Sequence, residues 1–148
     1  MRVLRSVFAL LMVALLTACA TGPKMSEVSA SIKPVQANEA RVYFYRSGSM
    51  MGAAIQPNIL LNGKVVGESK PGGFFFVTTA PGPMEVSTST EVEKKLTFNL
   101  DAGQTRYVRT KVGFGIMVGR VYPELVDPAE ATKELADTSY IGAPLPKP

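Results

Sequence analysis

The chain has no histidine and no tryptophan, and Cys19 is the one cysteine among its 148 residues. Without histidine there is no Ser-His-Asp arrangement, and the usual general base and the commonest metal ligand are both absent. A single cysteine forms no disulfide within the chain, so a folded domain must be stable without one. We therefore predict no catalytic residues, no metal site and no cofactor. A hydrolase would have to work with carboxylates alone.

The sequence also lacks an apolar run long enough to cross a bilayer. Its longest run, Val7–Leu16, has ten residues. As a helix these would extend about 15 Å, half of the roughly 30 Å hydrocarbon core. Arg2 and Arg5 precede the run, and the small residues Thr17 and Ala18 follow it. This order of charged start, short apolar stretch and small-residue cleavage site predicts a secretory signal peptide over residues 1–18.

Cys19 directly follows this leader, and the sequence Leu-Thr-Ala-Cys that it closes resembles a bacterial lipobox. The resemblance implies cleavage between Ala18 and Cys19, and a diacylglycerol and an N-acyl chain on Cys19. Several acyl chains together make a stable membrane anchor. Ala20 stands where an aspartate would resemble an inner-membrane retention signal, which favours the outer membrane of a bacterial envelope. The alternative is an ordinary signal peptide followed by an accidental cysteine.

Basic residues only slightly outnumber acidic ones. The whole chain has 16 Lys and Arg against 12 Asp and Glu, a net charge of +4. The leader holds two of the basic residues and no acidic one, so residues 19–148 carry 14 against 12, a net charge of +2. This balance gives no indication of a nucleic-acid partner.

Three segments follow the leader. Residues 19–38 are small, polar and without sustained periodicity, which predicts an acylated cysteine on a flexible tether; the alternative makes Ile32–Val35 a short edge strand. Residues 39–141 are predicted to form the folded domain. Residues 142–148 are rich in proline and predicted to be a disordered tail.

Short segments of β-branched and aromatic residues, separated by Gly, Pro and Asn turns, predict about seven strands in a small antiparallel β-sandwich. In the first segment, Val42 and Phe44 share one face, and Tyr43 and Tyr45 the other. The clearest predicted strands are Arg41–Arg46, Phe74–Thr79, Met84–Thr90, Leu96–Leu100, Thr105–Val112 and part of Ile116–Val126.

Asn62-Gly63, between two apolar runs, predicts a hairpin with a type I′ turn, because both central residues of that turn need positive φ. The pairs expected from a two-residue turn are Leu61 with Lys64, Leu60 with Val65 and Ile59 with Val66.

One helix is predicted near the C-terminus, over Ala129–Ala136. Asp127 suits the N-cap, Pro128 the first helical position, and Glu130 the third position of a capping box. We expect this helix to cover one edge or open end of the sandwich.

Several of these segments together resemble a known family. The stretches RVYFYRSG, NGKVVG, PGPMEV, DAGQTRYVR and AEATKEL, with the leader and lipobox, are similar to the bacterial lipoproteins grouped as domain of unknown function 2846. The resemblance covers about residues 39–137 and implies a small β-sandwich on an acylated N-terminus. It carries no agreed catalytic residues, so none is assigned here.

Two surfaces are candidates for binding. Tyr107, Arg109 and Lys111 alternate along one predicted strand and could hold anionic lipid, lipopolysaccharide or an acidic polymer; the alternative is an ordinary solvated strand face. Met50, Met51 and Ile55 lie in an apolar loop that could meet a protein partner. The alternative there is that they cap the end of the sandwich.

These features support three functional hypotheses. The first is a non-enzymatic lipoprotein, anchored in the outer membrane and facing the periplasm, that acts as an interaction or structural module for another envelope protein. The second is a binding module for an anionic ligand through Tyr107, Arg109 and Lys111. The third is an envelope hydrolase that uses carboxylates.

Overall fold

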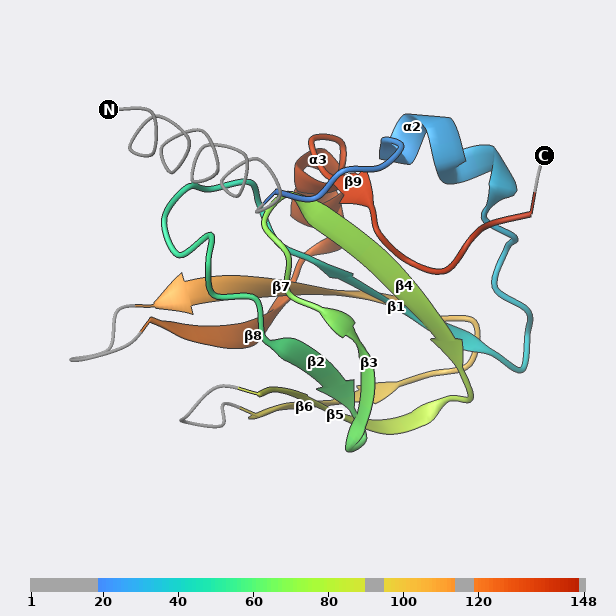
Figure 1. Cartoon of the computed structure of the whole chain (residues 1–148). Coiled ribbons are helices and arrows are strands. Elements are labelled where there is room, and N and C mark those ends of the chain that lie inside the picture. The colour runs from blue at the N-terminus through green and yellow to red at the C-terminus, as the bar shows by residue number, and fades with distance from the viewer. Residues whose placement is uncertain (1–18, 90–94, 114–118, 147–148) are drawn as a thin grey trace, which may run out of the picture.

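The computed structural model describes residues 19–89, 95–113 and 119–146. Within these ranges nine strands form two sheets packed face to face (Figure 1). The strands are β1 (Ala40–Tyr45), β2 (Asn58–Leu61), β3 (Lys64–Glu68), β4 (Gly73–Thr79), β5 (Gly82–Thr88), β6 (Lys95–Leu100), β7 (Thr105–Gly113), β8 (Arg120–Val126) and β9 (Ser139–Tyr140). The mainly β sandwich predicted from the sequence is confirmed, with nine strands in place of about seven.

One sheet has the strand order β8-β7-β1-β4-β9, and the other has the order β3-β2-β5-β6. All pairs are antiparallel except two. Strand β1 pairs in parallel with β7, Arg41 opposite Thr105, and β4 pairs in parallel with β9. The five-stranded sheet is therefore mixed. Strand β9 has two residues, which is too short for any alternating pattern to reveal it in the sequence.

The predicted hairpin is present, but its register is wrong at one pair. Asn62 has φ +49° and Gly63 φ +79°, as a type I′ turn requires. Leu61 pairs with Lys64 and Leu60 with Val65, as expected, and a bulge then places Ile59 opposite Gly67 instead of Val66. The ring of Phe75 explains the shift: a Cβ on Gly67 would lie 2.5 Å from it, so the position facing that ring must be glycine.

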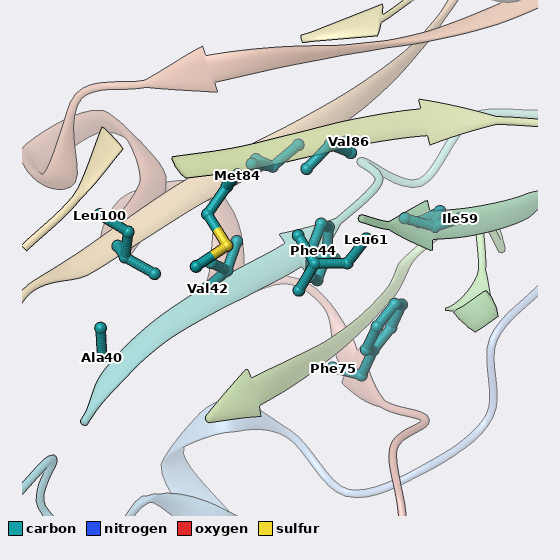
Figure 2. Packing of buried hydrophobic residues seen from close by; sticks show 10 residues of the cluster. Ala40, Val42, Phe44, Ile59, Leu61, Phe75, Met84, Val86 and Leu100 are labelled. Atoms are coloured by element: carbon teal, nitrogen blue, oxygen red, sulfur yellow. The ribbon is translucent and has the colours of Figure 1, made fainter. Parts of the chain in front are cut away.

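The main core lies between the two sheets. Val42 and Phe44 of β1 point into it, and the rings of Phe44 and Phe75 stack with centroids 5.2 Å apart. Figure 2 shows these residues meeting side chains from the facing sheet. The buried members are Ala40, Val42, Phe44, Ile59, Leu61, Phe75, Met84, Val86, Leu100 and Val108.

A second core covers the outer face of the five-stranded sheet. Tyr43, Tyr45 and Phe74 pack there against Ala131 and Leu135 of the helix α3 (Pro128–Leu135). Asp127 caps this helix, since its Oδ1 accepts a hydrogen bond from the backbone N–H of Ala129. The helix therefore covers a sheet face, and the expectation that it would close an edge or open end is wrong. Both faces of β1 are apolar because both are buried.

The predicted tether is wrong over residues 20–32, where the chain folds onto the domain. Helix α2 (Met25–Val28) and a 3-10 turn (Ser29–Ser31) lie against the second core, into which Val28 is buried. Lys24 forms a β-bridge with Ser139. A sequence of mostly polar residues with a few apolar ones does not show whether the segment packs on the domain or stays free.

Other terminal predictions also change. Residues 32–35 form no strand, which removes the alternative of an edge strand there. Leu145 packs on the second core, so the predicted disordered tail is ordered at that point. Residues 114–118, where part of one predicted strand falls, lie outside the described residues. Among the helices that the structure describes, none is long and apolar enough to cross a membrane.

Candidate functional site

Cys19, the predicted acylation site, is exposed at the very start of the described chain. Ala18, on the other side of the predicted cleavage site, lies outside the described residues. The next residue is fixed to the domain, because the N–H of Ala20 donates a 2.9 Å hydrogen bond to the carbonyl oxygen of Pro71. Since Pro71 lies two residues before β4, the predicted lipid attachment point is next to the start of that strand, and Figure 1 shows the blue start of the described chain there.

The chain between β1 and β2 forms a turn-rich segment, here called the methionine loop (Ser47–Gln56). Arg46, at its start, is only 3% exposed. Its guanidinium donates hydrogen bonds to the carbonyl oxygens of Gly52 (2.8 Å), Ile55 (2.6 Å) and Ser69 (3.1 Å). Burial lowers the pKa of Arg46, since desolvation disfavours the charged form. A buried cation thus holds the loop from inside.

Two methionines of this loop point outward. Met50 is 80% exposed and Met51 is 59% exposed. The alternative that they cap the end of the sandwich is therefore wrong. Ile55 is the exception, since it is partly buried and its Cδ1 fills the space that a Cβ on Gly119 would need. The loop remains an exposed apolar surface on a fixed backbone.

A second cluster joins β7, β8 and α3 through charges. Arg109 Nε lies 2.6 Å from a carboxylate oxygen of Glu124, and its Nη1 lies 2.7 Å from Glu130 and 2.6 Å from Glu134. Lys111 Nζ lies 2.7 Å from the same Glu124 oxygen. We call these five side chains the β7–α3 charge cluster.

The ionisation of the charge cluster follows from its contacts. Burial raises the pKa of the Glu124 and Glu134 carboxyls, but hydrogen bonds from Lys111 and Arg109 to Glu124, and from Tyr45 and Arg109 to Glu134, outweigh it and leave both below their usual value. Burial lowers the pKa of Arg109, and hydrogen bonds to the three carboxylates reverse this and raise it. Glu124 and Glu134 are therefore held as carboxylates, and Arg109 as a cation, at neutral pH.

Tyr45 adds a neutral donor to this cluster. Its Oη donates a 2.6 Å hydrogen bond to Glu134. Burial, followed by this bond to an anionic acceptor, raises the pKa of the phenol. Tyr45 therefore keeps its proton and holds the carboxylate in place.

The cations of this strand face are paired with carboxylates of the protein. The Arg109 side chain is only 13% exposed and already bonded to three carboxylates, and Lys111 shares one of them. Two cations and three anions give the cluster a net charge of −1. Tyr107 lies on the same face, partly buried, and stacks on Tyr43 with ring centroids 5.3 Å apart. The three residues share one face of β7, as predicted, and the ion pairs of Arg109 and Lys111 were not predicted.

A pocket of about 270 Å³ separates the methionine loop from the charge cluster. Both arginines that line it are hydrogen-bonded to protein oxygens, Arg46 to loop carbonyls and Arg109 to carboxylates. The side chains around it include Arg46, Ser47, Met51, Arg109, Thr110 and Glu134.

Two features were not predicted from the sequence: the pairing of Arg109 with Glu124 and Glu134, and the inward position of Arg46. Glu130 was assigned to a capping box, whereas its carboxylate contacts Arg109. One signal was available: Glu130 and Glu134 are four residues apart on the predicted helix and so share a face. Nothing in the sequence indicates which strand that face meets.

Comparison with known proteins gives the family. Residues 36–121 match the model of a family described as "Protein of unknown function (DUF2846)". The chain is also similar to an uncharacterized protein of Haemophilus influenzae, with 32% identity over 127 residues that cover 82% of this chain and 75% of the relative. No solved structure matches. The chain therefore belongs to the DUF2846 family.

Proposed function

We propose that this protein is a non-enzymatic lipoprotein of the bacterial outer membrane that faces the periplasm and serves as an interaction or structural module. The observation that carries this proposal is the position of Cys19. It follows a leader with the order of a signal peptide, and it is exposed at the point where the folded domain begins. Acylation there requires no rearrangement of the sandwich.

The chemistry of the charge cluster supports a role without catalysis. A general acid at neutral pH needs a carboxyl whose pKa is raised. The pKa values of Glu124 and Glu134 are shifted the opposite way, and both carboxylates are held by Arg109. The cluster is better suited to fixing helix α3 on the sheet, and for this reason we do not favour the carboxylate hydrolase.

The anchor is tested with a Cys19→Ser variant in cells fed radiolabelled palmitate. We expect the wild-type protein to incorporate label and fractionate with membranes, and the variant to do neither. A matched control adds Ser29→Cys, an exposed position, to the Cys19→Ser chain, which restores a thiol outside the lipobox. Label in that control, or unlabelled wild-type protein, would contradict the proposal.

The location and role need two further experiments. We expect the wild-type protein to sediment with outer-membrane markers on a density gradient and to resist protease added to intact cells. Cross-linking followed by affinity capture of the acylated protein from native membranes should recover a defined envelope protein. Recovery of the protein with inner-membrane markers would contradict the proposed address.

A further inference from the structure

The methionine loop lies beside the predicted acylation site, although the two are separated in sequence. Cys19 adjoins Ala20, which is hydrogen-bonded to Pro71. The next residue, Gly72, packs directly against Gly48 of the loop, since a Cβ on Gly72 would lie 3.8 Å from the Cα of Gly48. Gly72 N–H also donates a 3.0 Å hydrogen bond to the carbonyl of Arg46.

Met50 follows Gly48 by two residues. With about 3.8 Å between consecutive Cα atoms, this chain of contacts keeps Cys19 and Met50 within roughly 25 Å of each other. Figure 1 shows the same arrangement: the blue start of the described chain lies next to the segment that leads from β1 to β2.

The loop backbone is held in two successive turns. The N–H of Ala53 donates to the carbonyl of Met50 (3.3 Å), and the N–H of Ile55 donates to that of Gly52 (3.0 Å). Gly52 has φ +67° and lies against Val112, where a Cβ would come within 2.8 Å of the valine side chain. The buried guanidinium of Arg46 is hydrogen-bonded to the loop carbonyls of Gly52 and Ile55. Together with the turns, it keeps Met50 and Met51 directed away from the core.

We infer that the methionine loop is a second membrane contact, which inserts Met50 and Met51 into the bilayer next to the acyl chains of Cys19. This inference rests on the proposed lipid anchor. Acyl chains hold Cys19 at the interface, so the part of the domain beside it faces lipid. Exposed methionines are flexible and apolar, and two of them on a rigid turn gain from leaving water. The loop thereby determines which face of the sandwich rests on the membrane.

The loop contact is tested on acylated full-length protein in vesicles of phosphatidylethanolamine and phosphatidylglycerol. Since acylation occupies the only native thiol, a Met51→Cys substitution provides one site for a polarity-sensitive fluorophore. Val65→Cys is the matched control. Val65 is 60% exposed against 59% for Met51, and it lies on β3 of the four-stranded sheet, away from the methionine loop. We expect emission from position 51 to shift to shorter wavelength and to be quenched by brominated lipids, and that from position 65 to do neither.

Hydrogen exchange provides a second test of the loop contact, without a fluorophore. On these vesicles the backbone amides of residues 50–55 should exchange hydrogen more slowly than in the soluble Cys19→Ser domain, while those of residues 62–65 should not change. If the protein is acylated and position 51 behaves like position 65, the loop contact is overturned and the anchor stands. A loop protected only when a protein partner is added would also overturn it. If Cys19 is not acylated, both proposals fail.

Discussion

Glu134 accepts two 2.6 Å hydrogen bonds, from Arg109 of β7 and from Tyr45 of β1, and so links helix α3 to two neighbouring strands. Each of its two oxygens has one of these donors. The contact lies at the rim of the second core, where Leu135, the next residue, is only 2% exposed. The helix is thus held by apolar packing inside and a charge-assisted contact at its edge.

The first prediction concerns this carboxylate. Glu134→Gln keeps the shape but removes the charge opposite Arg109, so we expect the free energy of unfolding to fall by about 1–3 kcal/mol. Glu85→Gln is the matched control: Glu85 pairs with Lys95 at the surface, with side chains 42% and 47% exposed. Such a pair contributes at most about 1 kcal/mol. Urea unfolding of both variants measures the two losses of stability. Equal losses would contradict the larger contribution expected of Glu134.

The second prediction is a loss of stability in acid. The pKa values of Glu124 and Glu134 are lower in the folded protein than the ordinary value of 4.5. The unfolded chain therefore binds protons first, so their contribution is complete above about pH 5 and is lost as the pH falls through the folded values. Unfolding free energies measured from pH 7 to pH 3 should show this decrease. The decrease should be smaller in Glu134→Gln; an identical pH profile would rule out a contribution from Glu134.

The third prediction concerns Arg46. Arg46→Met removes the guanidinium that donates to the carbonyls of Gly52, Ile55 and Ser69, and we expect a loss of about 2–4 kcal/mol together with faster proteolysis in the loop. Arg41→Met is the control, since Arg41 is also buried and bonds elsewhere, to Lys33 and Thr78. It should lower stability without selective cleavage within residues 47–56, as mapped by mass spectrometry.

The fourth prediction concerns the glycine at the bulge. A Cβ on Gly67 would meet three atoms of the Phe75 ring at 2.5–2.9 Å, so Gly67→Ala should cost about 1–3 kcal/mol through overpacking. Gly63→Asn, in the hairpin turn, has open space around it and a residue that tolerates positive φ. It should cost less than about 1 kcal/mol. Thermal unfolding compares the two, and a smaller loss for Gly67→Ala would contradict the packing argument.

Local patterns predicted most of the strands and the helix. Alternation placed Val42 and Phe44 on one face of β1 and Tyr43 and Tyr45 on the other, and the two faces line separate cores. The Asp127 cap and the Asn62-Gly63 turn were readable because each depends on residues adjacent in sequence. Such a local pattern does not reveal which residues of other strands or helices a side chain will contact. The bulge at Gly67 depends on a ring from β4.

The candidate site was less predictable for the same reason. Tyr107, Arg109 and Lys111 lie on one face of β7, as expected, but the two cations are paired with carboxylates of β8 and α3. Arg46 reads as the polar end of a strand and is in fact the internal support of a loop. The sequence does not show which residue a charged side chain will contact, so a paired cation and an unpaired one look alike in it.

The parallel pairing of β1 with β7 has a consequence for how the domain forms. Residue 41 pairs with residue 105, so the strand at the centre of the larger sheet lacks one neighbour until most of the chain exists. Contacts between residues so distant in sequence require the closure of a long loop, which lowers the chain entropy before the contacts form, and they therefore slow folding. We expect no stable intermediate built from the N-terminal half alone. The domain should reach its native state as one unit, only after the last strands have been made.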